Sequence, residues 1–190
     1  MTVLSQHTSD TNTARAFASL KARFATWEEV AHAPVGRVAN AIRSGGLADQ
    51  KAARIKAILR EIERREEKMS LARLESLNDD EVEAYLCSLP GVGPKTAACV
   101  LVFSMGRAAF PIDTHVHRVT KRLGWIPSNA SVDKAHALLR DAVPPELRYE
   151  LHMQLIAHGR TVCTARTPNC SACVLLELCP TGSKLVAELA

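Results

Sequence analysis

Four cysteines near the C-terminus have a spacing that suits a metal centre. Cys163, Cys170, Cys173 and Cys179 form the pattern C-x6-C-x2-C-x5-C. Four thiolates this close together need a centre that neutralises their charge, and a tetrahedral zinc ion or a [4Fe–4S] cluster would do so. Two disulfides fit less well, because Cys170 and Cys173 are too close for a stable two-bridge arrangement. Spacing alone leaves both metals open, and the single CxxC pair favours iron–sulfur over a zinc ribbon.

A glycine-rich turn leads into a lysine that could act as a nucleophile. Residues 89–95 read LPGVGPK, and the backbone amides of Gly91, Val92 and Gly93 could face an anion such as a DNA phosphate. An ordinary corner between two helices is the alternative. Lys95 follows in the first helical turn, where the positive end of the helix dipole and partial burial both disfavour the ammonium form. A neutral lysine amine can form a Schiff base with a sugar C1′, although a solvated lysine or a phosphate contact is also compatible with this position.

A carboxylate follows eighteen residues after this lysine, in the string Ile112-Asp113-Thr114-His115. Asp113 is expected to cap the N-terminus of a helix. A carboxylate held in this way could stabilise positive charge developing at C1′ or help to activate the nucleophile. The capping role and the chemical role are compatible.

The elements that must position these residues are predicted to be helices. Only 4% of the residues are aromatic, β-branched runs are scarce, and strand patterns are absent. The fold class is therefore all-α with short connections. Apolar periodicity and capping residues predict helices over 49–69, 79–86, 95–105, 114–122, 133–143 and 145–159, with Asn78 or Asp79 as one cap.

The composition excludes some locations and partners. No apolar stretch approaches the roughly 20 residues needed to cross a bilayer, and the first residues lack a signal-peptide core. We therefore expect no membrane partner and a cytoplasmic location, nucleoid-associated if the source is prokaryotic. The net charge of +4 suits a polyanionic partner but does not by itself identify one.

Three strings together resemble the endonuclease III family, within the helix-hairpin-helix-GPD superfamily of DNA glycosylases. LPGVGPKTA, PIDTHVHRV and HGRTVC, the last followed by the cysteines, occur in the family's order and at its distances, and the similarity extends over residues 4–180. The resemblance implies two helical lobes with a DNA-binding cleft. Residues 1–107 would form the lobe with the helix-hairpin-helix element (about 79–105), and residues 108–190 the lobe with the [4Fe–4S] cluster loop (163–179).

The resemblance also implies an activity, that of a DNA N-glycosylase and abasic-site lyase. Lys95 matches the family's nucleophilic lysine and Asp113 its catalytic aspartate. The expected partner is duplex DNA containing oxidised pyrimidines or abasic sites, and the expected oligomeric state is a monomer. A non-catalytic DNA-binding module, or a monofunctional glycosylase for mismatched thymine or alkylated purines, is the alternative.

Further DNA contacts are implied by similarity to the family's loops. The segment 42–47 resembles a wedge loop, so Leu47 would enter the base stack, unless it only closes a small core. The segment 4–10 resembles the loop that fills the gap left by a flipped base. His7 stands there in place of the usual glutamine or asparagine, which leaves the opposite-base preference open. Apart from these loops, the short helix over 114–122 carries Arg118, Lys121 and Arg122. Arg118 and its two neighbours are expected to bind phosphate, and a solvated helix face is the alternative.

The start of the sequence departs from the family pattern. Family members carry about thirty further residues before the 4–10 loop, including a helix that packs on the cluster lobe. We therefore expect an apolar groove that is not covered by the chain itself, and lower stability than in longer relatives.

Overall fold

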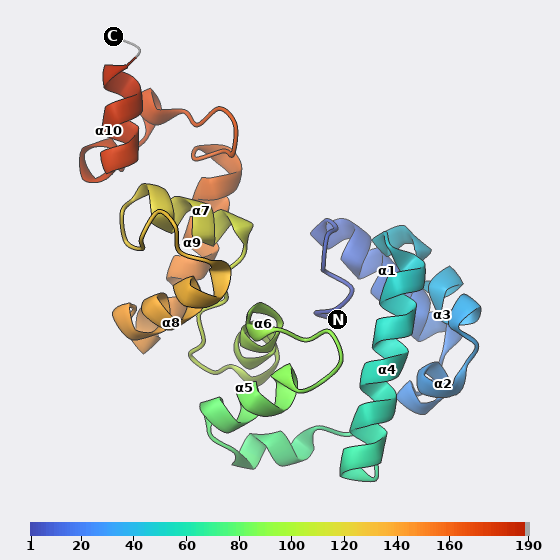
Figure 1. Ribbon diagram of the computed structural model, residues 1–190. Helices are drawn as coiled ribbons and strands as arrows, with labels where there is room; N and C mark the ends of the chain where they lie inside the picture. Colours follow the sequence, from blue (N-terminus) through green and yellow to red (C-terminus); the bar gives the residue numbers. More distant parts are fainter. Residues whose placement is uncertain (189–190) are drawn as a thin grey trace. The chain divides into compact units, whose positions relative to one another are not determined.

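The computed structural model describes residues 1–188, and all their regular elements are helices (Figure 1), which confirms the all-α prediction. None of these helices is long and apolar enough to span a membrane. In chain order the elements are α1 (Asp10–Arg23), α2 (Trp27–His32), α3 (Val35–Ala41), the 3-10 turn η1 (Arg43–Gly45), α4 (Ala48–Glu66), η2 (Ala72–Ser76), α5 (Asp79–Cys87), α6 (Pro94–Met105), α7 (Thr114–Arg122), α8 (Val132–Ala142), η3 (Pro145–Leu147), α9 (Arg148–Thr161), η4 (Cys170–Ala172), η5 (Leu176–Leu178) and α10 (Pro180–Ala187).

Each of the predicted helices is present, with small differences at the ends. Asn78 caps α5 in a capping box with Glu81, because the side chain of each residue accepts a hydrogen bond from the backbone N–H of the other. The segment predicted as one helix over 145–159 begins with η3, and α9 starts only at Arg148. Four helices were not predicted: α1, α2, α3 and α10. Three of these begin at a polar cap that the sequence displays, namely Ser9, Thr26 and Cys179.

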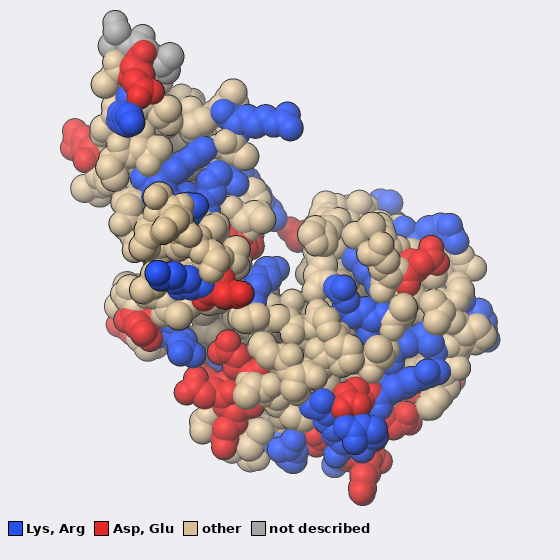
Figure 2. Space-filling view, viewed as in Figure 1, with Lys and Arg blue, Asp and Glu red and all other residues tan. Residues whose placement is uncertain are grey.

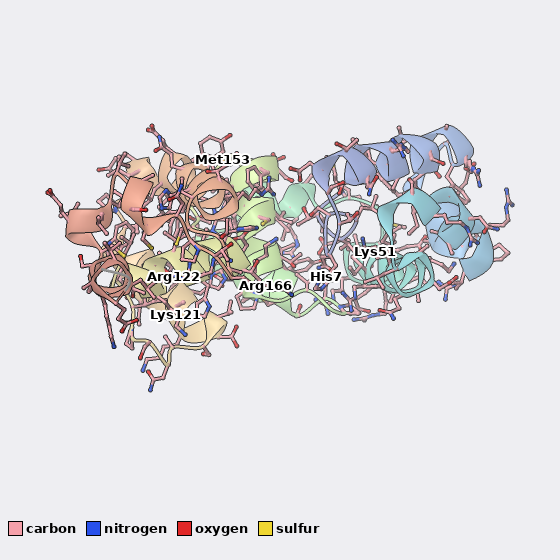
Figure 3. The ribbon with its side chains drawn as sticks, turned by 90° about the horizontal axis from the view of Figure 1, so that it is seen from above. His7, Lys51, Lys121, Arg122, Met153 and Arg166 are labelled. Atoms are coloured by element: carbon pink, nitrogen blue, oxygen red, sulfur yellow. The ribbon has the colours of Figure 1, made fainter. Side chains whose placement is uncertain are left out.

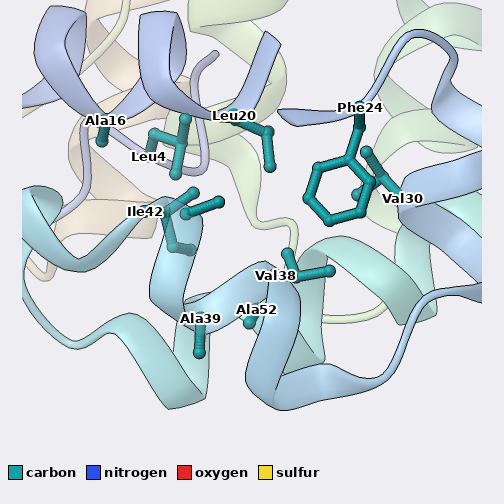
Figure 4. Packing of buried hydrophobic residues seen from close by; sticks show 10 residues of the cluster. Leu4, Ala16, Leu20, Phe24, Val30, Val38, Ala39, Ile42 and Ala52 are labelled. Atoms are coloured by element: carbon teal, nitrogen blue, oxygen red, sulfur yellow. The ribbon is translucent and has the colours of Figure 1, made fainter. Parts of the chain in front are cut away.

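The chain divides into two compact units, Met1–Val100 and Leu101–Ala190, of which the second is described up to residue 188. The core of the first unit collects apolar side chains from the N-terminal turn, α1, α2, α3 and α4 (Figure 4). In this core Gly45 lies against α1, since a Cβ added to it would be 3.1 Å from the Cβ of Ala16. The core residues are Leu4, Ala16, Leu20, Phe24, Val30, Val38, Ala39, Ala41, Ile42 and Ala52.

The second unit has its own core, built mainly on α7, α8 and α9. Gly159 allows α9 to approach α7, because a Cβ at this position would be only 2.9 Å from the Cβ of His115. The predicted lobe boundary after residue 107 stays a prediction. The buried members of this core are Phe110, Ile112, Val116, Val119, Ile126, Ala130, Ala135, Leu139, Val143 and Leu155.

The apolar groove expected from the start of the sequence stays a prediction. The first unit contains an apolar pocket with a volume of about 330 Å³, between α1, α4 and the segment that follows α4. Met1 and Val3 lie on one side of it, and Trp27 and Ile58 are among its other walls. The expected effect on stability remains a prediction.

Leu4 tests how strongly the N-terminal turn is anchored in the core. Leu4 is 2% exposed, so Leu4→Ala should lower the free energy of unfolding by about 2–5 kcal/mol through lost burial and the cavity left behind. Urea unfolding followed by helical circular dichroism measures this. Leu47→Ala, at a leucine that is 50% exposed in the same unit, should cost less than about 1 kcal/mol. Equal losses would show that the turn is not part of the core.

Candidate functional site

The glycine-rich turn is a tight hairpin between α5 and α6. Gly91 has a φ of +70°, which L side chains rarely adopt, and Val92 N–H donates to the carbonyl of Leu89 at 3.1 Å. The carbonyl of Gly93 accepts from the N–H groups of Thr96 and Ala97, so helical bonding begins at Gly93. The predicted helix-hairpin-helix geometry is therefore formed, and Lys95 lies half-buried in the first turn of α6.

The N-terminal loop is bound to this hairpin through a side chain that the sequence analysis did not single out. The Gln6 amide nitrogen donates to Thr96 Oγ1 at 3.2 Å, and its carbonyl oxygen accepts from Arg54 Nη1 at 2.8 Å. Arg54 lies against Gly91, where a Cβ would come within 2.5 Å of Arg54 Nε. Gln6 thus links the loop of His7, the helix α4 and the turn of α6 that carries Lys95.

The two residues expected to enter the DNA stack share an unusual backbone. His7 has a φ of +52° and Leu47 a φ of +49°, although neither is glycine. Left-handed backbone costs such residues about 1–2 kcal/mol, so the surrounding contacts must impose it. Both side chains are exposed at the surface. An exposed side chain on a strained backbone is typical of a residue that serves binding and not the packing of the core.

Asp113 caps α7 as predicted. One carboxylate oxygen, Oδ1, accepts from the N–H groups of His115 and Val116, both at 2.8 Å. Two charge-assisted bonds to a helix N-terminus hold the carboxylate in one orientation. Because both bonds use the same oxygen, Oδ2 is not needed for capping.

Two arginines of α7 hold the segment that enters the cysteine loop. Arg118 donates to the carbonyls of Gly159, at 2.7 Å, and Cys163, at 3.0 Å. Arg122 donates to Cys163 Sγ at 3.2 Å and to the carbonyls of the two residues that follow it. The phosphate contact of Arg118 stays a prediction, because the structure shows its guanidinium bound to backbone carbonyls of the same unit. Lys121 precedes Arg122 on the same helix, and Figure 3 labels both residues.

The four cysteines of the C-terminal pattern line one pocket of the second unit, together with residues such as Arg122 and His158. Burial raises the pKa of the Cys170 thiol, and the other three thiols of the pattern raise it further. Cys179 Sγ accepts from Gly182 N–H at 3.2 Å, and Cys173 Sγ lies 3.8 Å from His158 Nε2. Four mutually repelling thiolates in one pocket would be stabilised by a shared cationic centre.

The four thiols in this pocket are the donor set of a [4Fe–4S] cubane, in which each iron binds one thiolate. The donor set therefore fits a [4Fe–4S] cluster, held by Cys163, Cys170, Cys173 and Cys179.

Comparison with known proteins assigns the chain to a family. Residues 1–145 match the model of the HhH-GPD superfamily base excision DNA repair proteins, and residues 163–179 match the iron–sulfur binding domain of endonuclease III. The chain is a member of this helix-hairpin-helix superfamily of base-excision repair proteins. Within it, the chain belongs to the endonuclease III family, and its C-terminal centre is an iron–sulfur cluster.

Individual relatives support this assignment. Endonuclease III of Thermotoga maritima is 35% identical over 178 residues, which cover 94% of this chain and 79% of that protein. A candidate DNA glycosylase of Arabidopsis thaliana is 43% identical over 158 residues, or 83% of this chain, and this chain spans 54% of its length. A solved complex of endonuclease III trapped as a covalent intermediate with DNA superposes with a TM-score of 0.83 at 33% identity, covering 97% of this chain and 82% of that chain.

The metal content distinguishes the two centres that the sequence left open. The purified chain should contain about four iron atoms and show the broad visible absorbance of a [4Fe–4S] cluster. Cys173→Ala should lose most of the iron, whereas Cys87→Ala, outside the pocket, should retain it. One zinc atom per chain in place of iron would contradict the cluster.

The two hairpin glycines form a matched pair for testing the turn. Gly91→Ala should destabilise the protein by about 1–2 kcal/mol, because alanine must adopt a positive φ and displace the Arg54 side chain. A Cβ added at Gly93 would meet no atom within 4 Å, so Gly93→Ala should change the free energy of unfolding by less than about 1 kcal/mol. Urea unfolding of both variants measures the difference. The same effect in both would mean that backbone strain at Gly91 does not determine the turn.

Proposed function

We propose that this protein is a bifunctional DNA glycosylase and abasic-site lyase that removes oxidised pyrimidines from duplex DNA. The observation that carries the proposal is the placement of Lys95, half-buried in the first turn of α6, directly after the hairpin. A related endonuclease III has been trapped in a covalent intermediate with DNA, which supports an amine nucleophile. Asp113, fixed at the start of α7, supplies the carboxylate.

The chemistry requires a neutral amine and a carboxylate with free lone pairs. Lys95 Nζ attacks C1′ of the damaged nucleotide, the C1′–N bond breaks, and its electron pair leaves with the base, which takes up a proton. The sugar ring opens to an iminium between C1′ and Nζ. This iminium acidifies the C2′ proton, whose loss expels the 3′ phosphate, and water then hydrolyses the imine to free Lys95. Asp113 stabilises the positive charge at C1′ or accepts a proton from the nucleophile.

The remaining site residues would bind and distort the duplex. Backbone N–H groups of Gly91, Val92 and Gly93 would contact a phosphate, which positions DNA without reading its sequence. Leu47 would enter the stack as the damaged base leaves it, and His7 would pair with the orphaned base. The four cysteines would hold the cluster, which organises the 163–179 loop and takes no part in these steps.

Borohydride trapping on a duplex with one abasic site tests the nucleophile. Wild-type protein should form a covalent adduct, because the imine is reduced to a stable amine, and Lys95→Gln should form none. Lys134→Gln removes one positive charge from α8, a helix without predicted DNA contacts, and should still be trapped. Asp113→Asn should slow base removal by about 10²–10⁴-fold, measured on a thymine glycol duplex.

The outcome separates the alternatives. A folded, cluster-containing wild type that binds the abasic duplex without forming an adduct would contradict the lyase and favour a monofunctional glycosylase or a DNA-binding module. Faster release of mismatched thymine or of 3-methyladenine than of thymine glycol would contradict the proposed substrate.

A further inference from the structure

A buried lysine lies behind the two loops that carry His7 and Leu47. Lys51, in the first turns of α4, is 4% exposed. Its ammonium group donates to the carbonyl of Leu4 at 2.8 Å and to the carbonyl of Gly45 at 2.7 Å. A buried ammonium is tolerated only when such acceptors replace the water it has lost, so these bonds are hard to give up.

The two acceptors belong to two different surface loops. Leu4 precedes His7 by three residues, and Gly45 precedes Leu47 by two. Both acceptor residues pack in the first unit, since Leu4 is buried in the core and Gly45 lies against α1, but His7 and Leu47, which follow them, are exposed. The Lys51 ammonium therefore connects both loops, and Figure 3 shows Lys51 beside the loop of His7.

We propose that Lys51 is a positioning residue that holds the His7 loop and the Leu47 loop at one fixed separation, so that both side chains engage the same lesion. The inference rests on the proposed DNA contacts of these two residues. Their left-handed backbones cost free energy, so a loop released from Lys51 would relax to an ordinary conformation and turn its side chain away. One ammonium ion thus couples the wedge to the gap-filling residue.

The same helix provides a matched control. Lys56 is 5% exposed and also donates two hydrogen bonds to backbone carbonyls, those of Ala31 and Ala33. These carbonyls belong to the last turn of α2 and to the residue that caps its end, which carry none of the predicted DNA contacts. Burial lowers the pKa of both lysines. Lys51 and Lys56 therefore differ in which segment they hold and are alike in burial and bonding.

The test compares Lys51→Met with Lys56→Met in the full, cluster-containing chain. Methionine keeps the length and burial of the side chain and removes the ammonium. The first measurement is affinity for a duplex carrying a tetrahydrofuran abasic analogue opposite each of the four bases. The second is the fluorescence of 2-aminopurine placed opposite the analogue, which reports unstacking of the orphaned base. Thermal melting and borohydride trapping on a single-stranded abasic oligonucleotide are recorded alongside.

Lys51→Met should lower affinity for the abasic duplex by about tenfold or more, flatten the preference among opposite bases and abolish the fluorescence change. Trapping on the single strand should stay within about twofold of wild type, because it needs neither loop. Lys56→Met should keep its duplex affinity within about twofold of wild type, even if its melting temperature falls as much as that of Lys51→Met. Lys51→Arg, which can still donate to both carbonyls, should restore part of the opposite-base preference.

Two results would overturn the proposal. One is unchanged duplex affinity and opposite-base preference in Lys51→Met. The other is a loss in both variants that follows only their melting temperatures, which would make Lys51 purely structural. If Lys51→Met does not fold, Lys51→Gln, whose shorter amide cannot bridge both carbonyls, takes its place. A wild-type protein that does not distinguish the abasic duplex from an undamaged one would instead contradict the proposed function.

Discussion

The backbone carbonyls at helix ends are the constraint on which much of this structure depends. Every α-helix leaves its last four carbonyls without partners within the helix, and an all-α chain with short connections has many such ends. Here long cationic side chains from neighbouring helices satisfy them. Lys56 and Arg60 donate to the carbonyl of Ala31 in the last turn of α2, and Arg148 donates to carbonyls at the end of α8. Arg118 serves the end of α9 in the same way.

Because many Lys and Arg side chains bind groups within the protein, the positive charge of the chain is a poor guide to its DNA-binding surface. Figure 2 shows Lys and Arg side chains gathered over α4, which by itself suggests a surface for DNA. Several cations of α4 are engaged within the protein, however. Lys51 and Lys56 are buried, and Arg64 and Arg65 pair with Glu61, whose pKa their hydrogen bonds lower to about 2. The count of 24 Lys and Arg residues therefore overstates the cations that are free to meet phosphate. Backbone amides at the hairpin can make such contacts without a side-chain charge.

What could be predicted from the sequence was local, and what was missed depends on distant partners. The cap at Asp113, the capping box at Asn78 and the hairpin at Gly91 each involve residues within a few positions of one another, and each is present. Gln6 was not singled out because its partners, Arg54 and Thr96, are 48 and 90 residues away. The first three helices were not predicted although Ser9 and Thr26 cap two of them. Two of the three, α2 and α3, have only 6 and 7 residues, and helices this short depend on tertiary packing.

The cysteine loop, residues 162–179, has little regular structure of its own to stabilise it. Between the end of α9 and the start of α10 the chain forms only the short turns η4 and η5, so few backbone bonds hold it. Arg118 and Arg122 fix its beginning through Cys163, and the backbone of Gly182 donates to Cys179 at its end. Between these anchors, the thiol side chains face one another in a pocket. A cluster bound to all four would replace their mutual repulsion by covalent bonds, and so supply the stability that helical structure does not provide there.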